Sequence, residues 1–260
     1  MLMIRFGPAG LGGVKEAIIN LESYAKIGLK ACEIAFTYGI YLNEKEAIEI
    51  GKRSKELDIK LSIHAPYWIN LNSSEKEKIE KSKQRILDCC RIGHYLKAEY
   101  VVFHAGFYGK VEREKCYENV KKAIIEILEE IKKNKWDIKI APETMGKINV
   151  FGSVEDILQL VKDTGCGFCI DFAHLYARSN GKMSYKEMYE KVSSFKELHC
   201  HFSGINFGDK GEKNHELTPK SEIKKLLEVL PKNKDITIIN ESPSPVKDAE
   251  LMKEAWGELS

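Results

Sequence analysis

Six side chains that can bind a metal or transfer a proton stand at or near the ends of six strand-like runs. They are His64 after LSI, His104 after VVF, Glu143 after IAP, Asp171 after CI, His201 after LHC and Glu241 after TIIN. Singly, each is more commonly structural, as a hydrogen-bonded histidine or a helix-capping carboxylate. If the six side chains lie together, their unpaired charges would repel one another and would cost desolvation energy. Their joint occurrence at strand ends therefore favours divalent cations bound between them.

Two further histidines enlarge the candidate ligand set. His174 follows Asp171 by three residues, so a helical turn starting just past the strand would face both toward one cluster. His215 adds an imidazole from a long irregular stretch, residues 203–218. Because there are more than four candidate ligands and a single ion cannot use them all, two or three metals are expected. Imidazole and carboxylate without thiolate suit Zn²⁺, Mn²⁺ or Fe²⁺ in catalysis, and multi-metal sites can hydrolyse phosphodiesters.

The elements that must position these residues alternate between apolar runs and amphipathic segments. Strands are predicted over 3–6, 31–36, 60–64, 100–104, 138–143, 167–172, 198–202 and 236–241. Helices are predicted over 14–27, 44–57, 74–96, 112–133, 153–161, 184–195, 219–230 and 249–256. Eight strand-then-helix units predict one (β/α)₈ TIM barrel, α/β in class, over residues 1–260, with an open doubly wound sheet as the competing fold. A barrel gathers the C-terminal strand ends at one face, where active sites form.

Composition narrows the function classes. The 260 residues are 43% hydrophobic, enough for one substantial core. Lys and Arg number 41 against 39 Asp and Glu, a net charge of +2, which excludes nucleic-acid binding through a strongly basic whole-chain field. No apolar run approaches about 18 residues, and the first ten lack the organisation of a signal peptide, so a cytoplasmic protein without membrane contact is expected. The seven scattered cysteines predict reduced thiols, including the Cys166-Gly167-Phe168-Cys169 pair.

Motifs along nearly the whole chain resemble those of one known family. In order they are FGPAGLGG (6–13), SIHAPYWINL (62–71), VVFHAG (101–106), APETMG (141–146), CIDFAHLYA (169–177), HFSG (201–204), KNHEL (213–217) and NESP (240–243). The sequence resembles the endonuclease IV family of apurinic/apyrimidinic-site DNA endonucleases, in the xylose-isomerase-like barrel superfamily. The resemblance implies a metal-dependent enzyme that hydrolyses the phosphodiester 5′ to an abasic site in base-excision repair.

The resemblance also implies roles for the candidate ligands. One zinc would be held by His64 and His104 and bridged by Glu143 to a second; Asp171, His201 and Glu241 would complete the second site, and His174 and His215 would bind a third zinc. Glu143 and Glu241 would be the catalytic residues, with Glu241 orienting the attacking hydroxide. The family has an Asp two residues before the loop histidine, where this chain has Lys213. Asp209 or Glu212 could replace it through a shifted loop.

The DNA contacts implied by the resemblance begin with Tyr67, three residues after His64, which would enter the minor groove beside the abasic gap. Trp68 follows it, and aromatic wedges of this kind stabilise kinked DNA. Contacts to the DNA backbone would come from basic residues near the barrel mouth: Lys147, Arg178, Lys210 and Lys213. The implied partner is double-stranded DNA containing abasic sites, bound by a monomer.

Two alternatives remain open. A sugar isomerase or epimerase of the same superfamily would use one metal and the two glutamates as acid and base. Its ligands would be Glu143, Asp171, His201 and Glu241. A non-catalytic DNA- or protein-binding relative with a decayed third metal site is the other alternative, and Lys213 supports it. The joint presence of histidines 64, 104, 174 and 215 favours the nuclease, because the single-metal enzyme would not require them together.

Overall fold

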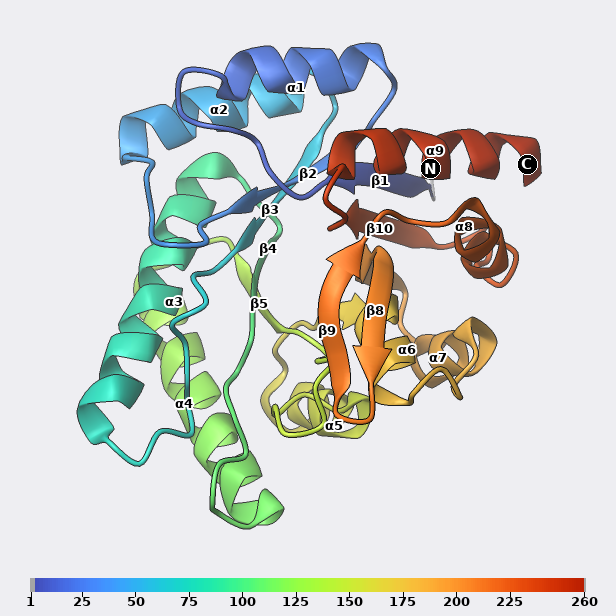
Figure 1. Ribbon diagram of the computed structural model, residues 1–260. Coiled ribbons are helices and arrows are strands. Elements are labelled where there is room, and N and C mark those ends of the chain that lie inside the picture. Colours follow the sequence, from blue (N-terminus) through green and yellow to red (C-terminus); the bar gives the residue numbers. More distant parts are fainter. Residues whose placement is uncertain (1–2, 260) are drawn as a thin grey trace.

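The computed structural model of the protein describes residues 3–259, and its strands form a ring (Figure 1). The ring contains β1 (Ile4–Pro8), β2 (Ala31–Ala35), β3 (Lys60–His64), β4 (Tyr100–Phe103), β5 (Lys139–Pro142), β6 (Ile170–Asp171), β7 (Glu197–Phe202) and β10 (Asp235–Asn240). Two parallel four-stranded sheets, β1-β10-β7-β6 and β2-β3-β4-β5, make up the ring. Parallel bridges from Ala9 to Glu33 and from Glu143 to Cys169 join the two sheets.

Helices surround this ring and return the chain to the start of each next strand (Figure 1). They are α1 (Ala17–Lys26), α2 (Glu44–Glu56), α3 (Lys76–Leu96), α4 (Arg113–Lys133), α5 (Val154–Thr164), α6 (Phe172–Arg178), α7 (Tyr185–Val192), α8 (Lys220–Leu227) and α9 (Pro245–Leu259). Capping boxes start α2, α5 and α7, where Asn43, Ser153 and Ser184 accept a backbone N–H and the third helical residue reaches back. The predicted TIM barrel is therefore confirmed.

The structure differs from the predicted elements in two places. The sixth strand is only Ile170–Asp171, because α6 begins at Phe172 and the Asp171 carboxylate accepts the His174 backbone N–H at 2.7 Å as its cap. The stretch 203–218, predicted as irregular, is an antiparallel hairpin of β8 (Gly204–Gly208) and β9 (Gly211–Glu216), drawn in orange in Figure 1. Its polar residues hid the strand pattern, because most of the hairpin does not contribute to the core.

The barrel has an apolar outer layer and a polar interior. Between strands and helices lies a large cluster of buried apolar residues that includes Ile34, Ile63 and Ile124. Inside the ring the buried apolar cluster is small and contains Tyr100, Val102, Ala141 and Cys169. Polar side chains therefore fill much of the interior above and beside this small cluster.

The remaining predictions about the chain are partly covered by the described residues. Within residues 3–259, no helix is both long and apolar enough to cross a membrane. The predicted domain covers 1–260, and its residues Met1, Leu2 and Ser260 lie outside the described part. All seven cysteines are free and buried, as the prediction of reduced thiols requires.

Candidate metal centre

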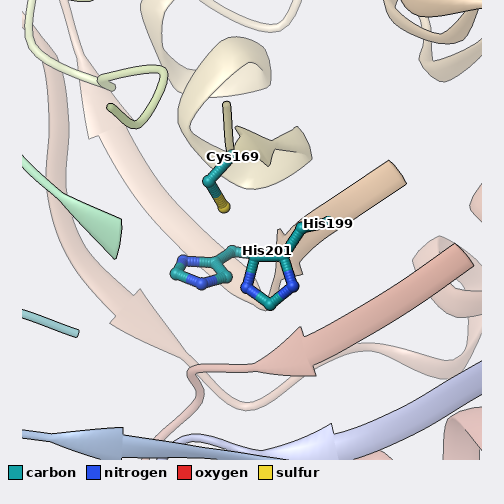
Figure 2. A group of neighbouring side chains, drawn as sticks. All are labelled: Cys169, His199 and His201. Carbon is teal, nitrogen blue, oxygen red and sulfur yellow. The ribbon is translucent and has the colours of Figure 1, made fainter. Parts of the chain in front are cut away.

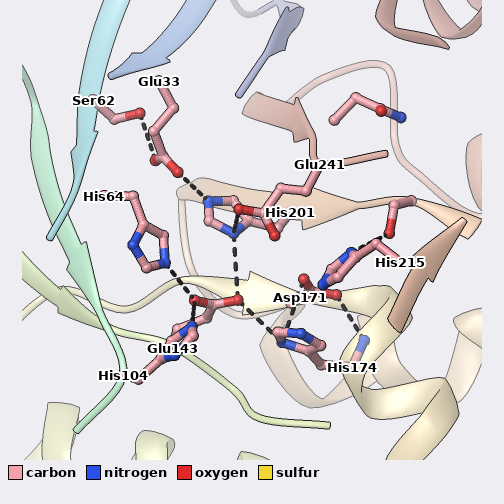
Figure 3. A network of polar contacts seen from close by, with 12 residues as sticks. Glu33, Ser62, His64, His104, Glu143, Asp171, His174, His201, His215 and Glu241 are labelled. Atoms are coloured by element: carbon pink, nitrogen blue, oxygen red, sulfur yellow. Dashed lines mark hydrogen bonds and ion pairs between the residues drawn. The ribbon is translucent and has the colours of Figure 1, made fainter. Parts of the chain in front are cut away.

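The barrel gathers the predicted ligands at the C-terminal ends of its strands (Figure 3). His64 ends β3, His104 and Glu143 follow β4 and β5, Asp171 ends β6, His201 lies in β7, and Glu241 follows β10. Parallel strands bring these ends together although up to 177 positions, from 64 to 241, separate them in the chain. His174 and His215 join them from α6 and β9. All eight predicted ligands thus lie in one cluster.

Glu143 is the centre of the cluster and is fully buried. Its Oε2 lies 3.2 Å from His64 Nε2 and 3.0 Å from His104 Nε2. Its Oε1 lies 3.1 Å from His174 Nδ1 and 3.3 Å from His201 Nδ1. One carboxylate thus contacts histidines from both sides of the cluster, which is the geometry of a bridging ligand.

Three adjacent groups have ligand atoms close enough to hold a cation. They are His64–His104–Glu143, Glu143–Asp171–His201–Glu241 and His174–Glu212–His215, with the ligand atoms of each group within 4.8 Å of one another. The first two share Glu143, and His174 contacts Glu143 as well. These groups match the two or three ions expected from the number of ligands.

Glu212 completes the third group because of a bulge in the hairpin. His215 pairs with Ile205, but Glu212 pairs with Phe207, so Lys213 is an extra residue in β9. In a regular strand the side chains of residues 213 and 215 would point to the same face of the hairpin. Because of the bulge, Glu212 takes the place of residue 213 on the face of His215. Its Oε2 lies 3.5 Å from His174 Nε2. Of the two carboxylates considered from the sequence, the structure brings in Glu212, while the exposed Lys213 lies over Gly208.

Three histidines are held by one ring nitrogen and present the other to the cluster. The Nδ1 atoms of His64 and His174 are hydrogen-bonded to the carbonyl oxygens of Ala65 and Thr144, both at 2.9 Å. His215 Nδ1 is 2.7 Å from the Ser203 hydroxyl. This anchoring selects Nε2 as the nitrogen free for a metal, since the partner of one ring nitrogen determines the role of the other.

The residues present fit divalent cations. Several buried polar atoms that face the cluster have no hydrogen-bond partner among the described residues: Glu143 Oε1, Asp171 Oδ2 and His201 Nδ1. Buried polar atoms without partners are costly, and three carboxylates at this spacing repel one another. Cations coordinated by carboxylate oxygen and imidazole nitrogen would satisfy the atoms and neutralise the charge.

Charge in the cluster is redistributed between its acids and its histidines. Burial alone would lower the pKa of His64, but the hydrogen bond and charge of Glu143 raise it to about 9. Burial would raise the pKa of Glu143 and Glu241, but His201 outweighs it, holding the Glu143 pKa well below its usual range and that of Glu241 at about 2. Burial raises the pKa of Asp171. Protons on the histidines therefore supply the positive charge that a metal would replace.

A cavity of about 320 Å³ opens onto the cluster. Tyr67 and Lys147 line it together with His64, His104, His174 and Glu212. Tyr67 is 59% exposed, and its ring centroid is 6.1 Å from that of His64 and 5.9 Å from that of His104. Trp68 is 64% exposed and is not among the lining residues. Tyr67 is thus at the mouth, while Trp68 lies beside it on the surface.

The basic residues expected at the DNA backbone divide into two kinds. Lys147, Lys210 and Lys213 are exposed. Arg178 instead donates from Nη1 to the carbonyl oxygens of Lys147 at 2.6 Å and Val150 at 3.1 Å. Its guanidinium therefore holds the β5–α5 loop, and its contact to a phosphate stays a prediction.

Sequence reasoning missed the polar residues below the cluster. They are Glu33, Ser62 and His199, none of which belongs to the predicted ligand set. The structure buries all three inside the barrel. The signal in the sequence was a single carboxylate inside the apolar run Ala31–Ala35, because a charged residue there must be buried with a partner.

The fold and the metal-capable strand ends define a barrel of the kind that binds metals at its C-terminal face. The family model described as xylose isomerase-like TIM barrel matches residues 21–256, and the chain belongs to this family.

Among curated relatives, the chain is 34% identical to the uncharacterized protein MJ0133 of Methanocaldococcus jannaschii, covering 99% of this chain and 98% of that protein. It is 28% identical to the apurinic-apyrimidinic endonuclease of Caenorhabditis elegans over 75% of this chain. The match spans 52% of the C. elegans protein, about half of its length.

Solved structures of two different activities share the fold. Endonuclease IV from Thermus thermophilus superposes with a TM-score of 0.75 at 22% identity, covering 98% of this chain and 100% of that chain. A D-tagatose 3-epimerase-like protein superposes with a TM-score of 0.73 at 21% identity, covering 98% and 97%. At these identities the likeness establishes the fold alone, so activity must be argued from the site.

Proposed function

We propose that this protein is a metal-dependent DNA endonuclease that hydrolyses the phosphodiester 5′ to an abasic site. The observation that carries the proposal is the presence of three adjacent ligand groups around Glu143. A single-metal epimerase would need only the group Glu143–Asp171–His201–Glu241, which leaves four histidines and Glu212 without a purpose. The similarity to the apurinic-apyrimidinic endonuclease of C. elegans supports the same activity.

The proposed site would hold two or three Zn²⁺ ions, with Mn²⁺ as the other candidate. His64 and His104 would hold the first ion, Asp171, His201 and Glu241 the second, and His174, Glu212 and His215 the third, with Glu143 bridging the first two. Bound cations of this kind polarise the phosphoryl oxygen, make water nucleophilic and stabilise the leaving oxyanion.

The side chains of the protein have their own tasks in this reaction. Glu241 is partly exposed to the cavity, with a side-chain exposure of 18%, and its low pKa keeps it ionised at neutral pH. It is therefore placed to accept a hydrogen bond from the attacking nucleophile and to orient it. Glu143 is buried at the centre and holds the two halves of the site at a constant separation.

The rim of the cavity would select the DNA. A volume of about 320 Å³ accommodates a phosphate and a sugar but not a duplex, so the duplex would lie across the mouth. Tyr67 stands there as the residue that enters the gap left by the missing base, with Trp68 beside it. Exposed Lys147, Lys210 and Lys213 would contact the DNA backbone, and the protein would act as a cytoplasmic monomer.

The epimerase remains the second candidate, because its four-residue metal group is complete and the epimerase-like fold matches this chain closely. One experiment distinguishes the two proposed functions. Purified protein is assayed for metal-to-protein ratio, for cleavage of a duplex with one abasic site, and for epimerisation of D-tagatose and D-fructose.

The nuclease proposal expects two or three metals per chain and cleavage 5′ to the abasic site, with no change of the undamaged control duplex. The nuclease proposal would be rejected in favour of the epimerase if the protein bound one metal per chain, epimerised a ketose and left the abasic duplex uncut.

A further inference from the structure

Beneath the metal centre, a second layer of polar side chains crosses the interior of the barrel. Glu33 on β2 is fully buried, and its Oε2 accepts a hydrogen bond from the Ser62 hydroxyl at 2.7 Å and contacts His199 Nε2 at 3.2 Å. Its Oε1 lies 3.0 Å from His201 Nε2 (Figure 3). Because β2 and β7 are not neighbours in the ring, these contacts can only cross the interior.

His201 is oriented differently from the histidines that are anchored through Nδ1. Its Nδ1 faces the cluster, 3.3 Å from Glu143 Oε1 and 3.4 Å from Glu241 Oε1. Its Nε2 therefore points down into the barrel, where Glu33 meets it. His64 uses a neutral carbonyl and His215 a hydroxyl as the anchor, whereas His201 has a carboxylate.

Stability alone does not explain a carboxylate at this depth. The side-chain partners of Glu33 are Ser62, His199 and His201, so its charge can be balanced only by a protonated imidazole or by a cation bound to the other side of a ring. Burying a carboxylate without such a partner is costly. A cation on the far side of the His201 ring would compensate the charge, since a metal at Nδ1 strengthens the N–H at Nε2 as a donor.

We infer that Glu33 is the positioning residue of the metal centre: held by Ser62 and His199, it fixes His201 with Nδ1 toward the metal shared with Asp171 and Glu241. The inference rests on the metal centre proposed above but not on the reaction catalysed there. His199 takes part through its contact with Glu33, and its ring is stacked on Tyr100 with centroids 5.0 Å apart. The carboxylate would accept a hydrogen bond from the Nε2–H group of His201 and increase the electron donation from Nδ1 to the metal.

A competing arrangement uses the same residues as ligands. Cys169, His199 and His201 have ligand atoms within 4.8 Å of one another, and Figure 2 shows the thiol of Cys169 near the two rings. A metal there would need a ring nitrogen of His201 and would compete with a carboxylate for it, because Nε2 is 3.0 Å from Glu33 and Nδ1 is 3.3 Å from Glu143. The contacts of Glu33 therefore favour the positioning role, and the thiol distinguishes the two arrangements.

The test measures cobalt binding to metal-free protein. Glu33→Gln and Glu33→Ala are titrated with Co²⁺ against a chelator while the visible d–d spectrum is recorded. Metal-free thermal unfolding is measured in parallel, and Asp248→Asn serves as the control, because Asp248 is a buried carboxylate in α9 bonded to the Thr218 backbone N–H. Loss of an outer partner typically weakens metal binding by about 10- to 100-fold.

The expected result is a loss of about 10- to 100-fold in affinity for one cobalt ion in both Glu33 variants, with an altered d–d spectrum in Glu33→Gln. Asp248→Asn should keep the wild-type affinity and spectrum. Unchanged cobalt affinity and spectrum in both variants, with only a lower metal-free melting temperature, would reduce Glu33 to a structural role.

A thiolate site would show a near-ultraviolet sulfur-to-cobalt band in the wild-type protein. Loss of this band and of one bound cobalt ion in Cys169→Ser would overturn the inference. Failure of the wild-type protein to cleave an abasic duplex would reject the proposed function, whereas the cobalt result decides the role of Glu33 by itself.

Discussion

The two faces of the barrel wall contrast sharply. The outer face packs aliphatic and aromatic side chains against the helices, as in Ile34, Ile63 and Ile124. The inner face carries Glu33, His199, His201 and Glu143, all buried and in contact with one another. Burial of apolar area on the outer face stabilises the fold, while the inner face buries charges at a cost in stability. Changes inside should therefore alter metal binding and chemistry, and changes outside should alter stability.

The largest effect is expected at the centre of the inner face. Glu143→Ala removes the carboxylate that contacts four histidines, so it should abolish cleavage of an abasic-site duplex while the far-ultraviolet circular dichroism stays like that of wild type. His104→Ala should behave in the same way. Activity at the wild-type level in either folded variant would reject the multi-metal site.

The matched change on the outer face is Ile124→Ala in α4, where the side chain is fully buried. The cavity left behind should lower the free energy of unfolding by about 2–5 kcal/mol, as measured by urea denaturation of metal-free protein. At temperatures where the variant is folded, its metal content should equal that of wild type. Loss of metal in the folded variant would show that the two faces are not independent.

The bulge in β9 yields a paired test within the third group. Glu212→Gln should weaken the binding of one metal ion by at least about 10-fold, because Glu212 is the carboxylate of this group. Lys213→Asp should leave metal affinity unchanged, since the side chain at 213 lies over Gly208 and not over the cluster. Tighter metal binding in Lys213→Asp would show that the hairpin adopts the unbulged register in solution.

Tyr67 separates recognition from chemistry. Tyr67→Ala should weaken binding to the abasic duplex by about 1–3 kcal/mol, the usual contribution of a stacked aromatic, and lower kcat/KM. Metal content and turnover at high enzyme concentration should remain. An equal loss of affinity for undamaged duplex, measured at the same salt concentration, would show that Tyr67 does not read the damage; loss of metal would show that it supports His64.

The smallest effect is a pH dependence of the metal-free protein that arises only from the inner face. The folded-state pKa of His64 is about 9 against an ordinary 6.5, so its stabilising contribution is complete below pH 6.5 and is lost as the pH rises through 9. The pKa of Glu241 is about 2 against 4.5, so its contribution is present above pH 4.5 and is lost as the pH falls through 2.

Thermal melts of metal-free protein should therefore show the melting temperature falling between pH 6.5 and 9. His64→Asn should flatten this slope, whereas Ile124→Ala should lower the whole curve without changing its shape. A slope unaffected by His64→Asn would assign it to other groups.

Much of the architecture was predictable because it depends on local signals. Apolar strand runs and helical periodicity predicted the eight barrel strands. The residue types at six strand ends, together with His174 and His215, predicted the eight candidate ligands. These signals are carried by neighbours in the chain. The hairpin escaped prediction because only Gly204 and Gly211 of β8 and β9 are buried, so neither strand carries a run of buried apolar residues.

Residue identity alone thus determined the barrel and the chemistry of its mouth, since apolar spacing decides which segments become strands and a histidine or carboxylate brings its own affinity for cations. The tertiary structure decided which atoms meet. A one-residue bulge in β9 places Glu212, and not Lys213, beside the cluster. Carbonyl oxygens of the β5–α5 loop accept hydrogen bonds from Arg178. Closure of the ring brings Glu33 of β2 into contact with His201 of β7. Contacts between residues 168 positions apart, from 33 to 201, depend on the closure of the ring, and no pattern within one segment encodes them.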